Sequence, residues 1–418
     1  MRVAIVGVGA AGLASARHAF QNGFKCDVFE MSNEIGGTWV YSDDVGQDKY
    51  GYPIHSAMYQ DLRTNIAKEA MGFPDFPVPS QEKSYLTHEE VLSFLNQYAD
   101  YFKLRQHIKF NCMVTDIRPT EGNKWQLTYV FKPNNESITN IYDAVMICNG
   151  HYNDPVLPEV TNLQKFSGEI LHSHSFRSPV PFKDKRILTI GAGPSGLDVT
   201  LQLSKCAKQV YFSHHSKRAS KTMFPSNVQH KPDVKSILNE KTIEFVDGSS
   251  CDIDVILFCT GYRYNFPFLH ESCGIIIDNN FIQPLYKHMI HMEKPTLCFI
   301  GIPFNVCTFH MFDLQARYFC NYLSGSMLLP STEEMRKHTE TEMENRWAKG
   351  LTKRQAHMMG EYQENYYNDL AKDADTDPIL PVYIKLRNFS VDNLYSDLIN
   401  FRENKYKIVD QENFVKVN

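Results

Sequence analysis

Two stretches of the chain show the same order of an apolar run, a glycine-rich turn and an amphipathic run. The first begins with "RVAIVGVG", a short apolar run rich in β-branched residues, which predicts a buried parallel strand. "AAGLASARHAFQNG" then places small and apolar residues at helical spacing and ends at Gly23, which suits a helix end. "KCDVFE" predicts a second strand, so residues 1–30 predict a βαβ unit.

The same order returns over residues 186–214, as "RILTIGAG", "PSGLDVTLQLSKCA" and "QVYFSHH". Between the two units, "THEEVLSFLNQYADYF" predicts a helix with Thr87 and Glu90 as a capping box, and residues 108–148 predict strands. Further strands are expected at "CDIDVILFCTGY" and "TLCFIGIPF", and residues 332–372 are charged and amphipathic. The fold class is therefore α/β, with two Rossmann-like dinucleotide-binding domains.

The first turn has the spacing G-x-G-x-x-G. Its first glycine permits the tight turn, the second lets the backbone approach a pyrophosphate, and the third lets helix and strand pack closely. Glu30 follows 18 residues after Gly12, at the end of the second strand, where a carboxylate accepts ribose hydroxyls and repels a 2′-phosphate. The turn therefore predicts FAD or NAD, and the predicted contacts are Gly7, Gly9, Ala10, Ala11, Gly12 and Glu30.

The second turn repeats the spacing but not the acid. We place Ser213 where an acid would otherwise stand, with Lys217 and Arg218 close behind. A hydroxyl and two cations favour a 2′-phosphate, so this turn predicts NADP(H), although a solvated basic loop would also explain the Lys-Arg pair. The predicted contacts are Gly191, Gly193, Pro194, Ser195, Gly196, Leu197, Asp198, Ser213, Lys217 and Arg218.

Together the two turns predict electron flow from NADPH to a flavin, which is typical of flavoprotein reductases and monooxygenases. The ten cysteines contain no C-x-x-C pair, which argues against a disulfide reductase. We expect an FAD-binding domain from residues 1–181 and 295–418, with an NADPH-binding domain inserted at 182–294.

Composition narrows the partners. A net charge of -5 argues against nucleic acid, and no apolar run reaches the 18 or so residues of a membrane helix. Scattered cysteines favour the cytoplasm, whereas two N-x-S/T triplets keep secretion open if a signal peptide was removed. Neighbouring histidines lack carboxylate or thiolate partners at ligand spacing, so no metal site is predicted.

The segment Phe166-x-Gly168-x-x-x-His172-x-x-x-Phe176 resembles the identifying motif of the flavin-containing monooxygenases, which oxygenate nitrogen and sulfur. The related Baeyer–Villiger enzymes usually carry Trp at the position of Phe176. Other family-like segments follow in order over more than 350 residues: "EIGGTW", "LRTNIAKEAMGFPDFP", "CNGHY", "FCTGY", "FIGIPF…FDLQARY" and "RWAKGL…H…Y…YYNDLA".

The resemblance implies further site residues. For FAD they are Gly37, Thr38, Trp39, Leu62, Thr64, Asn65, Val114 and Gln315, and for NADP they are Thr260 and Gly261. It makes Asn65 the catalytic residue, its amide holding the reactive oxygen or the nicotinamide amide, although an Asn also stabilises turns. His172 is interpreted as structural or NADP-orienting. The chain departs from the family at "IA" after Asn65 and at Asp313, where a longer acid is common.

The activity that the resemblance implies is oxygenation of a tertiary amine, such as an alkaloid, or of a sulfide. NADPH would reduce FAD, O₂ would add at flavin C4a, and the soft nucleophile would attack the distal oxygen. The polar tail is similar to that of the soluble insect and fungal members, which include the insect alkaloid N-oxygenases. The alternatives are an oxidase that releases H₂O₂, a Baeyer–Villiger enzyme and a non-enzymatic nucleotide sensor. Substrate and oligomeric state stay open.

Overall fold

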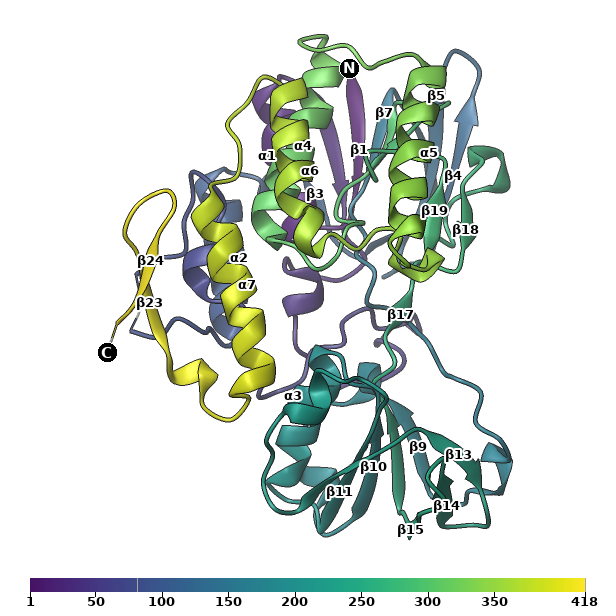
Figure 1. Ribbon diagram of the computed structural model, residues 1–418. Coiled ribbons are helices and arrows are strands. Elements are labelled where there is room, and N and C mark those ends of the chain that lie inside the picture. The colour runs from purple at the N-terminus through teal and green to yellow at the C-terminus, as the bar shows by residue number, and fades with distance from the viewer. Residues whose placement is uncertain (81, 418) are drawn as a thin grey trace.

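A seven-stranded sheet forms the centre of the larger of two units (Figure 1). The computed structural model describes residues 1–80 and 82–417. The strand order is β20-β21-β22-β7-β1-β2-β3, and the five strands from β22 to β3 run parallel. The strands are β1 (Arg2–Val6), β2 (Lys25–Phe29), β3 (Ile108–Lys109), β7 (Ala144–Ile147), β20 (Leu285–Tyr286), β21 (Ile290–His291) and β22 (Leu297–Phe299).

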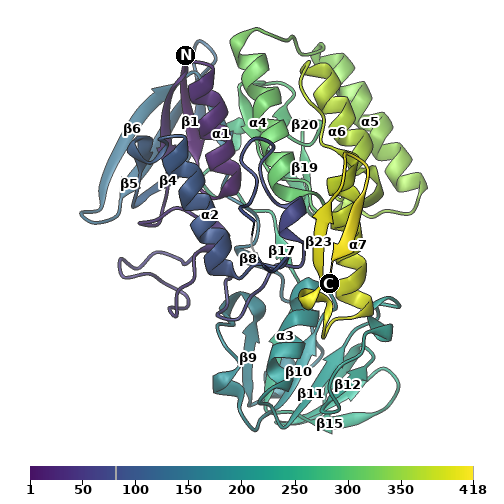
Figure 2. The same cartoon turned by 90° about the vertical axis from the view of Figure 1, so that its left-hand side faces the viewer.

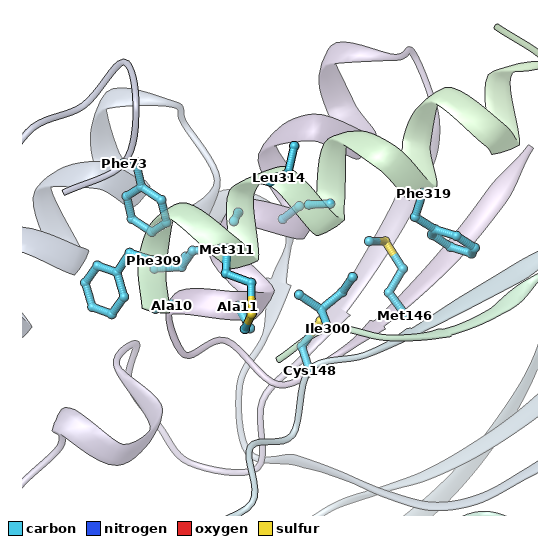
Figure 3. Packing of buried hydrophobic residues seen from close by; sticks show 14 of the residues in the cluster. Ala10, Ala11, Phe73, Met146, Cys148, Ile300, Phe309, Met311, Leu314 and Phe319 are labelled. Atoms are coloured by element: carbon cyan, nitrogen blue, oxygen red, sulfur yellow. The ribbon is translucent and has the colours of Figure 1, made fainter. Parts of the chain in front are cut away.

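Both faces of this sheet are covered, which explains why β1 reads as a continuous apolar run. Val3 and Ile5 pack in the core beneath α1 (Ala10–Gln21) and α4 (Thr308–Ser324), and Figure 3 shows Phe319 of α4 beside Met146 of β7 in the same cluster. Ala4 and Val6 point to the opposite face. That face is covered by an antiparallel sheet of β4 (Cys112–Thr120), β5 (Lys124–Phe131) and β6 (Glu136–Tyr142).

The smaller unit carries a second sheet with the order β12-β11-β10-β16-β9. It consists of β9 (Glu169–His172), β10 (Arg186–Ile190), β11 (Gln209–Ser213), β12 (Val228–Lys231) and β16 (Val255–Phe258), with α3 (Pro194–Ser204) packed on it. A three-stranded antiparallel sheet of β13 (Val234–Ile237), β14 (Thr242–Phe245) and β15 (Ser250–Asp252) lies beside it. The two predicted βαβ units and the predicted α/β class are confirmed.

The predicted limits of the inserted domain, 182 and 294, do not match the strand pairing. β9 begins at Glu169 and pairs with β16, so the second sheet starts before residue 182. β20 and β21 belong to the first sheet, so the chain has returned to the larger unit well before residue 294. The two crossings run side by side, because β8 (Asp154–Pro155) pairs antiparallel with β17 (Tyr262–Arg263). Short edge strands carry too little periodicity to reveal such limits in a sequence.

The remaining elements come mostly from the C-terminal third. They are α5 (Thr332–Ala348), α6 (Gln363–Asp373), α7 (Pro381–Ser396), β18 (Ile276–Asp278), β19 (Phe281–Gln283), β23 (Lys405–Ile408) and β24 (Phe414–Val417), while α2 (His88–Tyr101) lies earlier and has the predicted capping box. Figures 1 and 2 show α7 running from the larger unit to the smaller one. The Tyr383 ring packs on His310 of α4, and the Thr222 hydroxyl of the smaller unit donates to the Tyr395 carbonyl. Within the described residues, no helix is both long and apolar enough to cross a bilayer.

Candidate active site

A single large cavity is lined by residues of both units. Its volume is about 1490 Å³, larger than the roughly 300–1,000 Å³ that suits one small ligand. Both glycine turns line it, together with the segments 36–40, 53–59 and 62–66 and the loop before α4. A space of this size, shared by two turns of the same design, is suited to two dinucleotides rather than one.

The first turn needs its glycines for space as well as for conformation. Gly7 has a φ of +98°, and a Cβ there would lie 2.6 Å from the Cys148 carbonyl oxygen. A Cβ at Gly12 would lie 1.9 Å from the Gly7 carbonyl oxygen. Gly9 is the N-cap of α1, and no side chain caps this end, so the first N–H groups of the helix are left for a ligand. Such an end binds phosphate oxygens through its N–H groups and dipole.

Glu30 stands one residue beyond β2 and is held by two backbone groups. The Val8 N–H donates to one carboxylate oxygen (3.0 Å) and the Ser32 N–H to the other (2.8 Å). Burial raises the pKa of this carboxyl, while the two N–H donors oppose that rise. Each oxygen keeps further lone-pair capacity, and Glu30 lines the cavity, so the geometry fits an acceptor of ribose hydroxyls.

The second turn has the same glycine geometry as the first at its first and third glycines. Gly191 has a φ of +109°, and a Cβ at Gly196 would lie 1.8 Å from the Gly191 carbonyl oxygen. Gly193 caps α3 without a side-chain hydrogen bond, and a Cβ on it would meet nothing within 4 Å. The open space above Gly193 and the uncapped helix end therefore fit a second pyrophosphate.

The strand end of the second unit corrects one predicted residue. The Gly7 N–H donates to the Phe29 carbonyl (2.8 Å), and the Gly191 N–H donates to the Ser213 carbonyl (3.0 Å). The register therefore aligns Ser213 with Phe29, and the counterpart of Glu30 is His214. Ser213 is fully buried, and its hydroxyl donates to the Pro232 carbonyl (2.7 Å). Ser213 does not line the cavity, so the predicted contact is not made by this residue. The other part of the prediction holds, because no acid stands at this strand end.

The two predicted cations differ. Arg218 lines the cavity, stacks on the Tyr395 ring at 4.0 Å and pairs with Asp392 (2.6 Å). Lys217 is exposed and lies outside the lining. His215, which is not among the residues predicted to contact NADP, lines the cavity instead.

Most of the other predicted site residues also line the cavity. They are Ala10, Ala11, Gly37, Thr38, Trp39, Leu62, Thr64, Asn65, Val114, Pro194, Ser195, Asp198, Thr260 and Gly261. Gly12, Gly196, Leu197 and Gln315 pack behind it. Gln315 supports the wall, because its Oε1 accepts from the Gly301 N–H (2.9 Å) and its Nε2 donates to the Tyr366 hydroxyl (2.7 Å).

Asn65 lies on a segment whose backbone is fixed from both sides. The Thr64 N–H donates to the Leu86 carbonyl (2.8 Å), and the Leu86 N–H donates to the Thr64 hydroxyl (3.1 Å). Among the described residues, none hydrogen-bonds the Asn65 amide, which lines the cavity. The family departure at "IA" does not loosen this segment, because the Ala67 N–H donates to the Ser390 hydroxyl. Asn65 is thus presented on a firm backbone with its donors and acceptor unused.

The segment leading to the second turn is structural in this fold. Gly168 is required because a Cβ there would lie 2.4 Å from the Asp254 carbonyl oxygen. Phe176 packs between Tyr59 and Phe182, at ring distances of 5.5 and 5.9 Å. His172 ends β9 and lies outside the cavity lining; its Nδ1 accepts from the His174 N–H, and burial lowers its pKa to about 4. These contacts give the segment the task of joining β9 to the larger unit.

A buried ion pair that the sequence did not reveal ties the two units together beside Asn65. Arg402 donates to the Asp198 carboxylate of α3 (2.6 Å) and, through Nε, to the Thr64 carbonyl (3.2 Å). The Tyr59 hydroxyl donates to the same carboxylate. Arg387 of α7 also lines the cavity. Both arginines lie in a tail whose pattern is simply polar, so no local signal marks them.

Comparisons with known proteins show the family of the chain. The family model described as flavin-binding monooxygenase-like matches residues 1–226 and 219–392. Senecionine N-oxygenase of Tyria jacobaeae is 32% identical over 422 residues, which cover 99% of this chain and 91% of that protein. Flavin-containing monooxygenase FMO GS-OX-like 4 of Arabidopsis thaliana is 35% identical over 389 residues, covering 88% and 86%.

Solved structures of flavin monooxygenases are also similar to this chain. S-allyl-L-cysteine S-oxygenase from Allium sativum superposes with a TM-score of 0.90 at 32% identity, covering 96% of this chain and 94% of that one. Cyclohexanone monooxygenase, at a TM-score of 0.65 and 15% identity, shares the fold. The predicted family is confirmed: the chain belongs to the flavin-binding monooxygenase-like family and is a flavin-dependent monooxygenase.

Proposed function

We propose that this enzyme uses NADPH and O₂ to oxygenate a nucleophilic nitrogen or sulfur atom, with FAD at the first turn and NADPH at the second. One observation carries the proposal: two uncapped helix ends and Asn65 all line one cavity. Bound FAD would supply hydride acceptance and oxygen activation, which no side chain of the protein can supply. The protein's own residues bind, orient and shield.

The first turn and Glu30 fit the adenosine half of FAD. The α1 N-terminus would bind the pyrophosphate, and the two carboxylate oxygens held by Val8 and Ser32 would accept from the ribose. At the second turn, the α3 N-terminus would bind the pyrophosphate of NADPH. Arg218 and the acid-free strand end favour the 2′-phosphate.

The side chains near the glycine turns suit a reaction that needs no protein acid or base. His55 and His151 line the cavity, and burial lowers the pKa of each to about 4, so both rings are neutral at pH 7. A neutral amine or a sulfide can attack an activated oxygen without losing a proton first. Asn65 offers both amide donors and an acceptor to hold the reacting groups in place.

The relatives support nitrogen and sulfur as the oxygenated atoms. One relative is a senecionine N-oxygenase and one solved structure is that of an S-allyl-L-cysteine S-oxygenase, each 32% identical to this chain. Cyclohexanone monooxygenase shares only the fold, so ketone oxygenation is the less favoured alternative.

The test compares the amount of NADPH consumed with the amounts of oxygenated product and H₂O₂ formed. Purified enzyme is given NADPH and O₂ with methyl phenyl sulfide, trimethylamine or cyclohexanone, and NADPH loss, oxygenated product and H₂O₂ are measured together. We expect about one sulfoxide or N-oxide for each NADPH consumed. H₂O₂ equal to the NADPH consumed would instead identify an oxidase, and a lactone from cyclohexanone would identify a Baeyer–Villiger enzyme. Asn65→Ala is expected to shift the balance toward H₂O₂.

A further inference from the structure

One buried cation of the cavity wall, Arg387, lacks the carboxylate partner that most of the other buried cations have. Buried arginines and lysines in the described residues mostly pair with a carboxylate: Arg17 with Asp75, Lys68 with Glu69, Lys132 with Asp48, Lys287 with Asp369 and Arg346 with Glu342. Such pairing is expected, because an unpaired buried charge is costly. Arg387, only 6% exposed, pairs with no carboxylate in the part of the chain that the structure describes.

Arg177 shows how a buried guanidinium can be satisfied without a carboxylate. It makes five hydrogen bonds to backbone carbonyls, those of Asp44 (twice), Ser56, His174 and Phe176. These bonds occupy all five of its N–H donors. Arg177 is therefore complete without a ligand, and it lies outside the cavity lining.

Arg387 is incomplete by the same count. Its Nη1 donates to the Asn388 side-chain oxygen (3.0 Å) and its Nη2 to that of Asn305. Both acceptors are neutral amides, and three of the five N–H donors remain, including Nε, which is shielded from solvent and has no partner among the described residues. Arg387 and Asn305 both line the cavity, so the guanidinium and one of its two amide partners form part of the cavity wall.

The charges around Arg387 do not compensate it. The carboxylate that influences it is that of Asp392, which already pairs with Arg218 and is largely exposed. Burial lowers the pKa of the Arg387 guanidinium, which nevertheless stays protonated, as arginine does in proteins. Arg218, itself in the lining, adds a second positive charge. This part of the wall is therefore positive and short of hydrogen-bond acceptors.

We propose that Arg387 binds an anionic oxygen group, a carboxylate or a phosphate, of a molecule that occupies the cavity. A planar guanidinium with free donors suits either group, since both accept two parallel N–H bonds. Two sources are compatible with this chemistry: a carboxylate on the amine or sulfide substrate, or a phosphate of NADPH. The substrate source rests on the proposed function and would make the substrate class an anionic sulfide or amine.

The first experiment does not depend on oxygenation. Flavin-loaded wild type, Arg387→Gln, Arg387→Lys and the control Lys217→Gln are melted without ligand, with NADP⁺ and with (methylthio)acetate. We expect Arg387→Gln to be no less stable than wild type without ligand, because it removes an uncompensated buried charge. We also expect it to lose stabilisation by one of the two anions, whereas Lys217→Gln keeps both.

The second experiment identifies the source of the anion. Dissociation constants for NADP⁺ are measured by calorimetry, and kcat/KM is measured for (methylthio)acetate and for its neutral match, (methylthio)acetamide. A substrate carboxylate predicts that Arg387→Gln lowers kcat/KM for the acid about tenfold or more and leaves the amide unchanged. A phosphate predicts a similar weakening of NADP⁺ binding and no discrimination between the two sulfides. Arg387→Lys should recover part of whichever effect occurs.

One pattern would overturn the proposal. If Arg387→Gln melts well below wild type without ligand, yet keeps NADP⁺ affinity and the acid-to-amide preference within about twofold, Arg387 only fastens α7 to Asn305. If the wild type oxygenates no substrate but its NADP⁺ binding still depends on Arg387, the proposed function is contradicted and this inference is supported.

Discussion

The two glycine turns differ less in their backbones than in what stands around them. In each turn, a Cβ on the third glycine would lie within 2 Å of the first glycine's carbonyl oxygen, and the helix that follows has no side-chain cap. At the strand ends they diverge, since Glu30 is fixed by two N–H donors inside the cavity, whereas its counterpart His214 lies outside the lining. On the proposed function, the same backbone arrangement would bind a pyrophosphate at each turn, and the side chains beyond the two strand ends would select the nucleotide.

The largest effect is expected from substituting the glycines of the second turn, where one glycine is needed for packing and another for a ligand. Gly196→Ala should cost about 3 kcal/mol or more of unfolding free energy, because its Cβ would lie 1.8 Å from a backbone oxygen that cannot move alone. Gly193→Ala, three residues earlier, should change stability by less than about 1 kcal/mol and yet weaken NADP⁺ binding. Urea unfolding and calorimetry measure the two quantities. Equal stability loss in both variants would refute the distinction.

The next effect concerns the acid at the first strand end. Glu30→Gln should weaken FAD binding about tenfold or more, because charged acceptors contribute about 1.5–3 kcal/mol. The readout is the flavin content of the purified protein and the dissociation constant of FAD. Ser213→Ala is the control from the other strand end. Within the described residues the Ser213 hydroxyl bonds only the Pro232 carbonyl, so both nucleotides should bind as before. Weaker NADP⁺ binding in Ser213→Ala would restore the role first predicted for it.

A smaller effect is expected at the rim of the second turn. Arg218→Gln should raise the KM for NADPH about fivefold and leave that for NADH unchanged, since a half-exposed cation contributes about 1 kcal/mol. Lys217→Gln should do neither, because Lys217 lies outside the cavity lining. Steady-state kinetics with both nucleotides decide this. An unchanged preference for NADPH in Arg218→Gln would shift attention to His215.

The smallest effect on stability is expected at the start of β1 and β10, the first strands of the two βαβ units. The Arg2 N–H donates to Asp143 and the Arg186 N–H to Asp254, but only Asp254 also pairs with the guanidinium of the same arginine. Arg186 lowers the pKa of Asp254 to about 2, so the stabilisation is present at neutral pH and is lost as the pH falls from about 4 through about 2. Because Asp254 is one-third exposed, we expect Asp254→Asn to cost only about 0.5–1 kcal/mol.

Urea unfolding at a series of pH values tests this last prediction. The difference between wild type and Asp254→Asn should shrink toward zero in acid. A difference that is constant from pH 7 to pH 3 would mean that the ion pair contributes nothing measurable and that the asparagine acts through the backbone bond alone.

Local patterns in the sequence were enough to predict what depends on local geometry. Glycine spacing marked both turns, and Thr87 and Glu90 marked the start of α2, because each is fixed by residues a few positions apart. The domain limits failed because β9 is a short edge strand that exists only through its pairing with β16. The predicted counterpart of Glu30, Ser213, is one residue too early in the chain. The strand register decides which residue follows the last paired one, and the composition of the segment does not reveal that register.

The two arginines that the C-terminal segment contributes to the site, Arg387 and Arg402, could not be predicted from the sequence. Arg402 lies 204 residues from Asp198 along the chain, and Arg387 lies 82 residues from Asn305. Their positions depend on how α7 packs across both units, and no periodicity or spacing encodes such a contact. An isolated arginine in a polar segment resembles any solvated residue until the fold buries it.

The most direct test of two nucleotides in one cavity is the visible absorbance of the purified enzyme, mixed with NADPH without oxygen. The account predicts a yellow protein with one flavin per chain, bleached by one equivalent of NADPH in wild type and only at much higher NADPH concentration in Gly193→Ala. A colourless protein, or a flavin that NADPH leaves oxidised in the wild type, would contradict it.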